Sequence, residues 1–260
     1  MILDEELKLS KALAKEAGRK ILEFYGTALT YIDSDNPLTI ADREANKIIT
    51  SKIREMFPNH YILTEEETDN KERLKGDFVW IIDPLDGTKE FINNIGEFTV
   101  NIALVFKGEP VLGIIYIPVT EEMYFAVKDK GAYLEKHNIT KLHVSNKKDL
   151  NEMNVVKSRF HSNDKLESFL DGHGFSNVKI IGSSLKGALV ASGKADVYFR
   201  FVPVNEWDIC AMDIILREAG GILTDFEGNI LRYNNRNTLF KNFVASNNTV
   251  HDKLLSMIKE

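Results

Sequence analysis

The sequence predicts a layered α/β fold (an α+β arrangement of layers), in which helices cover β-sheets. In the first half, two amphipathic segments precede apolar runs separated by turn residues, which is typical of helices packed on an antiparallel sheet. In the second half, short apolar runs alternate with helical patterns, which is typical of a layered α/β structure. At 260 residues and 43% hydrophobic, the chain can bury a large core. We therefore expect a single domain over residues 1–260, with halves of about 1–136 and 137–260.

The helices and strands of the first half follow from hydrophobic periodicity. Apolar residues at helical spacing predict a helix over residues 4–25 and a second helix that ends at Pro58. A short strand over 61–64 and a fully apolar strand over 78–82 come next. Turn residues between apolar runs then predict two hairpins, with strands over 98–106 and 111–117, and over 123–127 and 132–134.

The second half is interpreted in the same way, with the seam between the halves expected within residues 136–149. Gly220 and Gly221 form a C-cap signal for the helix that precedes them. Strands are expected over 154–156, 178–181, 196–201 and 243–245, and helices over 164–170, 185–191, 207–219 and at the C-terminus.

Composition and charge exclude several classes of protein. The 33 basic and 39 acidic residues give a formal net charge of −6 without a basic cluster, which argues against nucleic-acid binding. The single cysteine, Cys210, allows no internal disulfide and fits a reducing compartment. The acidic N-terminus lacks a signal-peptide core, and no apolar run is long enough to span a membrane. We therefore expect a cytoplasmic protein, and the sequence does not indicate its oligomeric state.

The stretch WIIDPLDGTKEF, residues 80–91, places two carboxylates at the end of a buried strand. Pro84 fixes its own φ and is expected to end the strand, so that the chain turns between Asp83 and Asp86. Two acids at a buried strand end are costly unless a cation lies between them. An Asp-capped turn is the structural alternative. The three-residue spacing excludes both an EF-hand loop and a D-x-D phosphoryl-acceptor motif.

Three further acids follow a strand or begin a helix. Glu65 comes directly after the strand over 61–64, and it is the one of three consecutive glutamates that we expect to point inward. Asp42 and Asp208 each lie near a helix N-terminus, where the helix dipole favours a carboxylate. A solvated turn is the alternative for Glu65, and helix capping alone is the alternative for Asp42 and Asp208.

Together these segments resemble the lithium-sensitive, magnesium-dependent phosphatases of the inositol monophosphatase superfamily. The resemblance lies in NPLTIAD (36–42), ILTEEE (62–67), WIIDPLDGTKEF (80–91) and NEWDICAMDIILREAGG (205–221), in the same order over most of the chain. GTKEF followed by GEFTVNIALV, with GSSLK (182–186) and YFR (198–200), resembles the 3′(2′),5′-bisphosphate nucleotidases within it. The resemblance implies an αβαβα sandwich of the sugar phosphatase type, with the site between its two halves.

The resemblance also implies a role for each motif residue. Asp42 and Thr88 would form the catalytic pair that orients an attacking water. Lys186 and Arg200 would bind the phosphate that is not cleaved, although each is ordinary surface charge when taken alone. Two or three Mg²⁺ ions would be held by Glu65, Asp83, Asp86, Asp208 and the main-chain carbonyl of Leu85. The full set of implied substrate-binding residues is Gly87, Thr88, His161, Ser184, Lys186, Arg200 and Asp208.

The implied substrate is a small bisphosphorylated nucleotide, adenosine 3′,5′-bisphosphate, whose 3′-phosphate is removed in sulfur metabolism. Ile32 departs from the family pattern, because bisphosphate nucleotidases often carry a lysine there. Two alternatives stay open. An inositol or sugar monophosphatase would share the metal site, and Lys89, Glu90 and Lys186 argue against it. A non-catalytic, metal-dependent nucleotide-binding regulator would have lost a ligand or Thr88, and neither loss is seen.

Overall fold

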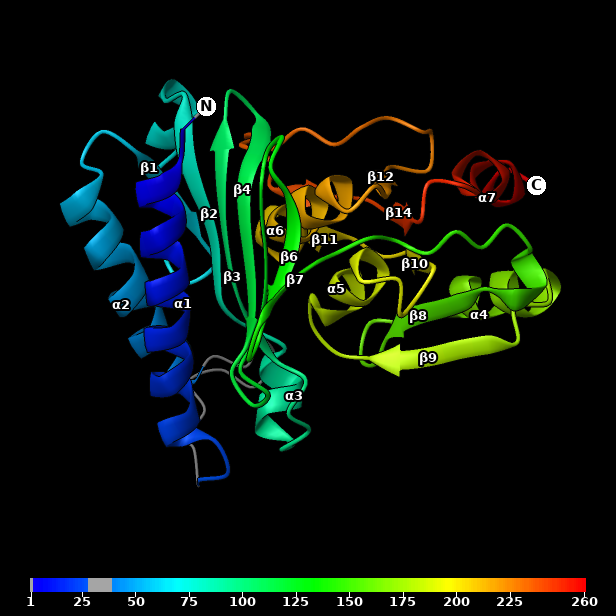
Figure 1. The fold of residues 1–260 in the computed structure, drawn as a ribbon, viewed down its shortest axis with the longest axis horizontal. Coiled ribbons are helices and arrows are strands. Elements are labelled where there is room, and N and C mark those ends of the chain that lie inside the picture. Colours follow the sequence, from blue (N-terminus) through cyan, green and yellow to red (C-terminus); the bar gives the residue numbers. More distant parts are fainter. Residues whose placement is uncertain (1, 28–38) are drawn as a thin grey trace.

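The computed structural model describes residues 2–27 and 39–260, which form two β-sheets with helices between them and on both outer faces (Figure 1). The five layers form an αβαβα sandwich, as the sequence resemblance implies. The outer face of the first sheet carries α1 (Asp4–Phe24) and α2 (Ile40–Met56), and α5 (Leu185–Ala191) and α6 (Glu206–Glu218) lie between the sheets. The far face of the second sheet carries α4 (Asp164–Gly172) and α7 (His251–Ile258).

The first sheet contains seven described strands in the order β1-β2-β3-β4-β5-β6-β7. β1 and β2 are parallel, and the other neighbouring pairs are antiparallel. Trp80 and Ile82 pack toward the outer helices, whereas Val79 and Ile81 pack toward α6, so both faces of this strand are buried along its length except at its two end residues. The strands are β1 (Tyr61–Thr64), β2 (Phe78–Asp86), β3 (Thr99–Phe106), β4 (Glu109–Ile117), β5 (Glu122–Val127), β6 (Gly131–Glu135) and β7 (Ile139–Lys141).

The second sheet contains five described strands in the order β12-β14-β10-β8-β9. The central strand β10 is parallel to β8 and antiparallel to β14. Two shorter strands, β11 (Val204–Asn205) and β13 (Leu239–Phe240), pair with each other outside this sheet. The strands of the second sheet are β8 (Asn154–Ser158), β9 (Asn177–Ile181), β10 (Val197–Arg200), β12 (Ile222–Thr224) and β14 (Phe243–Ser246).

Close packing fixes α6 between the two sheets. Gly113 of β4 faces this helix so closely that a Cβ atom there would lie 2.7 Å from the carbonyl oxygen of Ala211. Glycine is therefore needed at residue 113 for the helix to lie on the sheet. The helix also packs on β2, and its first turn carries Asp208 beside the C-terminal end of that strand.

The sequence did not predict β7, β11, β12 or β13, which are two or three residues long. Because β7 pairs with β6, the first sheet extends past residue 136, and the division of the chain into two halves near that residue stays a prediction. No helix in the described ranges is long and apolar enough to cross a bilayer.

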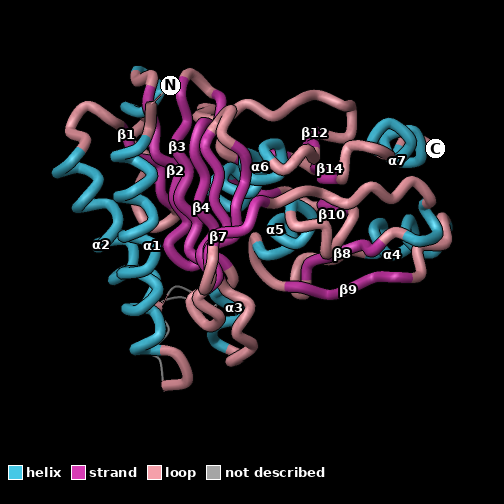
Figure 2. Tube along the Cα trace, in the orientation of Figure 1, coloured by secondary structure: helices cyan, strands magenta, loops and turns pink. Residues whose placement is uncertain are grey.

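Pro84 does not end its strand, so that prediction is wrong. β2 continues to Asp86, and its pairing with β3 shifts register between the pairs Asp83↔Asn101 and Asp86↔Thr99. A proline has no backbone N–H to give to the ladder, and a local irregularity accommodates this. The chain then enters the short helix α3 (Thr88–Ile92), which lies at the end of the first sheet (Figure 2).

Candidate active site

The main cavity is lined by residues from both halves of the chain. Its volume is about 470 Å³, which is within the usual range for small-molecule sites. Its lining combines two opposite kinds of charge. The acidic side chains are Glu65, Glu66, Asp83, Asp86, Glu90 and Asp208, and the basic ones are Lys89, His161, Lys186 and Arg200.

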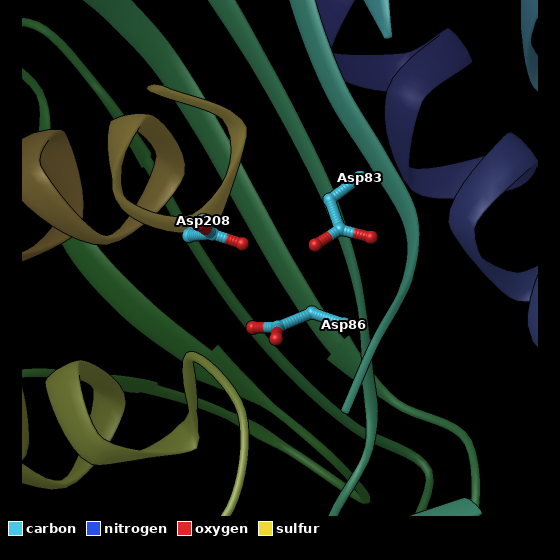
Figure 3. Close-up of side chains that lie close together, drawn as sticks. All are labelled: Asp83, Asp86 and Asp208. Atoms are coloured by element: carbon cyan, nitrogen blue, oxygen red, sulfur yellow. The ribbon is translucent and has the colours of Figure 1, made fainter. Parts of the chain in front are cut away.

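Three of the acidic side chains point toward one another (Figure 3). Asp83 and Asp86 come from the end of β2 and Asp208 from the first turn of α6, and one carboxylate oxygen of each lies within 4.8 Å of the others. In a regular strand, residues three apart point to opposite faces of the sheet. The register shift at Pro84 removes this alternation, so Asp83 and Asp86 face the same point.

Each of these carboxylates uses one oxygen to bind the protein. Asp83 Oδ1 accepts a hydrogen bond from the Leu85 amide at 3.1 Å. Asp208 Oδ2 accepts one from the Asn205 amide at 2.8 Å, which caps α6. Asp86 Oδ2 accepts one from Asn101 Nδ2 at 3.2 Å and one from a main-chain amide, that of Ser184. Within the described part of the chain, the second oxygen of each carboxylate has no protein donor.

The electrostatics of the three aspartates fit a divalent cation. Burial raises the pKa of Asp83 well above its usual range, and the charges of Glu65 and Asp86 raise it further. Burial and the charge of Asp86 raise the pKa of Asp208 to about 7. Carboxylate oxygens that are shielded from water and lack a donor are costly, and hard cations such as Mg²⁺ prefer carboxylate oxygens. The donor set therefore fits a metal ion of this class.

The other two predicted metal ligands lie next to this cluster. Glu65 lines the cavity together with Glu66, which is the less exposed of the two, and the carboxylate of Glu65 is not one of the three that lie within 4.8 Å of one another. It is exposed at the cavity mouth, yet the protein around its carboxyl group, followed by the charge of Asp208, raises its pKa. The carbonyl oxygen of Leu85 lies 3.2 Å from Thr88 Oγ1 and is one of two acceptors available to the single hydrogen of that hydroxyl.

Asp42 serves both as a helix cap and as a partner of Thr88. Its Oδ2 accepts hydrogen bonds from the amide and hydroxyl of Thr39, in the capping box that begins α2. Its Oδ1 accepts a hydrogen bond from Thr88 Oγ1 at 3.2 Å. The capping interpretation and the catalytic interpretation of Asp42 are therefore compatible, because they involve different oxygens.

Gly87 lets the chain turn from β2 into α3. Its φ of +92° lies in the left-handed region, which a glycine adopts without strain. Gly87 and Thr88 consequently line the cavity at the start of this helix.

Lys186 and Arg200 are buried cations that the protein satisfies only in part. Lys186 Nζ donates to the carbonyl oxygens of Ser183 at 2.5 Å and Ile181 at 3.4 Å. Burial lowers the pKa of Lys186 to about 8, although the charge of Asp86 opposes this shift. Arg200 donates through Nε and Nη2 to two carbonyl oxygens of the segment 202–203. Among the described residues, only these two guanidinium hydrogen bonds are found, so up to three of the five N–H groups remain for a ligand.

His161 lines the same cavity but is exposed to solvent. The protein around its ring, followed by the charges of Arg200 and Lys89, lowers its pKa to about 4. Because the ring is exposed, we expect solvent to screen part of this shift. A neutral imidazole is the form that results near pH 7.

Sequence reasoning missed two residues that support the site, Asn101 and Glu97. Asn101 donates to Asp86 and accepts a hydrogen bond from the Ser184 hydroxyl at 2.7 Å. Glu97 accepts hydrogen bonds from the Gly182 amide at 2.7 Å and from Arg159 Nη2 at 2.8 Å, and it thereby ties the two halves together. Both residues belong to GEFTVNIALV, which sequence analysis used only as a family resemblance. Ile32 lies outside the described residues.

Comparisons with known proteins agree with this architecture. The model of the inositol monophosphatase family matches residues 2–260. Among curated proteins, the chain is 41% identical to the 3′(2′),5′-bisphosphate nucleotidase CysQ of Salmonella typhimurium, over 86% of this chain and 92% of that protein. It is 34% identical to the fructose-1,6-bisphosphatase/inositol-1-monophosphatase of Thermotoga maritima, over 86% and 82%.

Solved structures show the same similarity. CysQ from Bacteroides thetaiotaomicron, described as a bacterial member of the inositol monophosphatase family, superposes with a TM-score of 0.81 and 36% identity over 93% of this chain and 97% of that chain. An inositol monophosphatase of Thermotoga maritima superposes with a TM-score of 0.84 and 30% identity over 98% and 97%.

Proposed function

The chain belongs to the inositol monophosphatase family, and on that premise we propose that it is a Mg²⁺-dependent 3′(2′),5′-bisphosphate nucleotidase. The proposed reaction hydrolyses the 3′-phosphate of adenosine 3′,5′-bisphosphate to give AMP and phosphate. One observation carries the proposal: a single cavity contains both two partly satisfied buried cations and a cluster of three carboxylates, each with one oxygen that has no donor among the described residues. The similarity to CysQ nucleotidases supports the choice of substrate. A cytoplasmic location is part of the proposal, because Cys210 alone allows no internal disulfide.

We assign the metal to the carboxylates of Glu65, Asp83, Asp86 and Asp208 and the carbonyl of Leu85, with two or three Mg²⁺ ions. Bound Mg²⁺ supplies positive charge that offsets the charge of the phosphate and makes water a better nucleophile. The hydrogen bonds from Leu85, Ser184, Asn101 and Asn205 hold the carboxylates in place before the metal binds. Hydrogen bonds of this kind to metal-binding carboxylates orient their oxygens and so strengthen metal binding.

Thr88 and Asp42 act as the pair that orients water. When the Thr88 hydroxyl donates to Asp42 Oδ1, its oxygen can accept a hydrogen bond from a water molecule. That water is then directed at the phosphorus, and the bond between phosphorus and the ribose oxygen breaks. Asp42 is held by Thr39, so the direction of this hydrogen bond is fixed by the helix cap.

Lys186 and Arg200 bind the phosphate that is not cleaved. Two of the N–H groups of Lys186 and two of those of Arg200 are used by carbonyl oxygens, and the others remain for phosphate oxygens. An inositol monophosphate carries no second phosphate, so these cations would gain nothing from it. This difference separates the proposed function from the monophosphatase alternative.

Phosphate release from adenosine 3′,5′-bisphosphate and from inositol 1-phosphate, measured side by side with Mg²⁺, tests the proposal. We expect kcat/KM to be higher for the bisphosphate by a factor of about ten or more, since a charge-assisted contact contributes about 1.5–3 kcal/mol. Equal or faster hydrolysis of inositol 1-phosphate would favour the monophosphatase. Tight binding of the bisphosphate without release would favour the non-catalytic regulator.

A further inference from the structure

Glu90 is a buried carboxylate that the proposed reaction does not use. Its residue is 5% exposed, lies in the first turn of α3 and lines the main cavity. In the described part of the chain, no hydrogen bond from another residue reaches its carboxylate. Two other buried acids, Glu206 and Asp213, differ from Glu90, because each of them accepts hydrogen bonds from other residues.

Two glycines make room for this carboxylate. A Cβ atom on Gly182 would lie 2.6 Å from Glu90 Oε1, and one on Gly87 would lie 3.4 Å from Oε2. The Glu90 carboxylate therefore lies between the β2–α3 turn and the loop that begins at Gly182. Gly87 and Thr88 are the residues beside which the cleaved phosphate is expected.

The chemistry of the Glu90 carboxylate limits what it can bind. A buried acceptor without a donor is costly, so its partner must come from the contents of the cavity. A phosphate is excluded as that partner, because two anions repel each other. In a ribonucleoside bisphosphate, the neutral donor nearest the cleaved phosphate is the hydroxyl on the adjacent ribose carbon.

We infer that Glu90 accepts a hydrogen bond from the sugar hydroxyl next to the cleaved phosphate, an inference that rests on the proposed function. Glu90 is then a specificity residue that distinguishes ribonucleotides from deoxyribonucleotides. The competing role is electrostatic, since the charge of Glu90 also favours the charged form of Lys186. The two roles separate experimentally, because glutamine keeps an acceptor oxygen but carries no charge.

The test compares adenosine 3′,5′-bisphosphate with 2′-deoxyadenosine 3′,5′-bisphosphate. For the wild type, we expect kcat/KM to be about 10- to 100-fold higher for the ribonucleotide, the range for a hydrogen bond to a charged group. Glu90→Ala should bring this ratio close to one by lowering the ribonucleotide rate. Glu90→Gln should keep part of the ratio.

Glu97→Ala is the matched control, because Glu97 also contacts the Gly182 loop but does not line the cavity. Damage to the loop should lower both rates together and leave the ratio at its wild-type value. A wild-type ratio near one, or a ratio that survives Glu90→Ala, would overturn the inference while the proposed function stands. Failure to release phosphate from either nucleotide would instead overturn the proposed function, and the inference with it.

Discussion

Two aspartates of α6, the half-buried Asp208 and the fully buried Asp213, differ in the partners that the protein gives to their carboxylates. Asp213 is fully buried and accepts hydrogen bonds from Arg217 Nε at 2.7 Å, Arg217 Nη2 at 2.5 Å and the Tyr233 hydroxyl at 2.8 Å. Asp208 accepts a hydrogen bond from one amide, and its second carboxylate oxygen faces Asp83 and Asp86. Burial raises the pKa of both, to about 6 for Asp213 and about 7 for Asp208.

The difference separates structural acids from functional acids within one helix. Burial alone does not distinguish them, because both pKa values are raised. Asp213 is compensated by a cation and a hydroxyl of this chain, whereas Asp208 lacks such a partner among the described residues and faces two more carboxylates. A cluster of uncompensated acids is costly unless a ligand compensates it.

The largest effect is expected from Asp208→Asn. Loss of one carboxylate should lower kcat/KM about a thousandfold or more, because a bound metal contributes several kcal/mol to transition-state stabilisation. The free energy of unfolding of the metal-free protein should stay equal or rise, since one repulsive charge is removed. Steady-state phosphate release and urea unfolding measure the two quantities. Near-normal turnover at modest Mg²⁺ would make Asp208 a simple helix cap.

The second-largest effect is expected at Asp42 and Thr88, because Asp42 both caps α2 and accepts a hydrogen bond from Thr88. Thr88→Ala should lower kcat about a hundredfold with little change in Mg²⁺ affinity, because the water loses its orientation. Asp42→Asn should lower kcat to a similar extent and also weaken the cap of α2. The double variant should be little worse than either single one, since the two residues act as a unit. A double variant whose loss of kcat equals the product of the two single losses would contradict the claim that Asp42 and Thr88 act as a unit.

Asp213→Ala should show the reverse of Asp208→Asn. The substitution leaves the partly exposed Arg217 without its carboxylate, so it should lower the free energy of unfolding by about 3 kcal/mol. The kcat of the folded fraction should stay within about twofold, because Asp213 does not line the cavity. Urea unfolding measures the free energy of unfolding, and active-site titration gives the folded fraction from which kcat is calculated. A large loss of kcat at full folding would show that the two acids are not distinct.

A smaller effect is expected on the pH dependence of stability. The raised pKa values mean that the folded protein binds more protons than the unfolded chain above about pH 4, so stability should fall as pH rises from about 4 to 7. Mg²⁺ should reduce this slope, because the metal pairs with Asp208 but not with Asp213. Urea unfolding at several pH values, with EDTA or with Mg²⁺, gives both slopes. The same slope of stability against pH with EDTA and with Mg²⁺ would contradict the distinction between Asp208 and Asp213.

The sequence predicted most of the fold, because long apolar runs and helical spacing depend on residues close together in the chain. The shortest strands were missed for the same reason: β7 and β13 are too short and too exposed to give a periodic signal. Pro84 was misinterpreted, since only the partner strand shows that pairing resumes at Asp86.

The positions of the candidate acids were predictable from their motifs, but the use of each oxygen was not. The donors that occupy Asp86 Oδ2 come from Asn101 and Ser184, which are distant in sequence. The same limit applies to Glu90, which the sequence marked only as a difference from inositol monophosphatases. Its carboxylate lies between Gly87 and Gly182, and this position depends on the contact between the β2–α3 turn and the loop that begins at Gly182.

The most direct test of the central claim is the thermal unfolding midpoint of wild type and Asp208→Asn, each measured with EDTA and with saturating Mg²⁺. If a bound cation supplies the positive charge that the cavity carboxylates lack, Mg²⁺ should raise the wild-type unfolding midpoint by several degrees. It should raise the midpoint of Asp208→Asn much less, and that variant should be at least as stable as the wild type in EDTA. The same Mg²⁺ shift in both proteins, or a lower midpoint for the variant in EDTA, would contradict the claim.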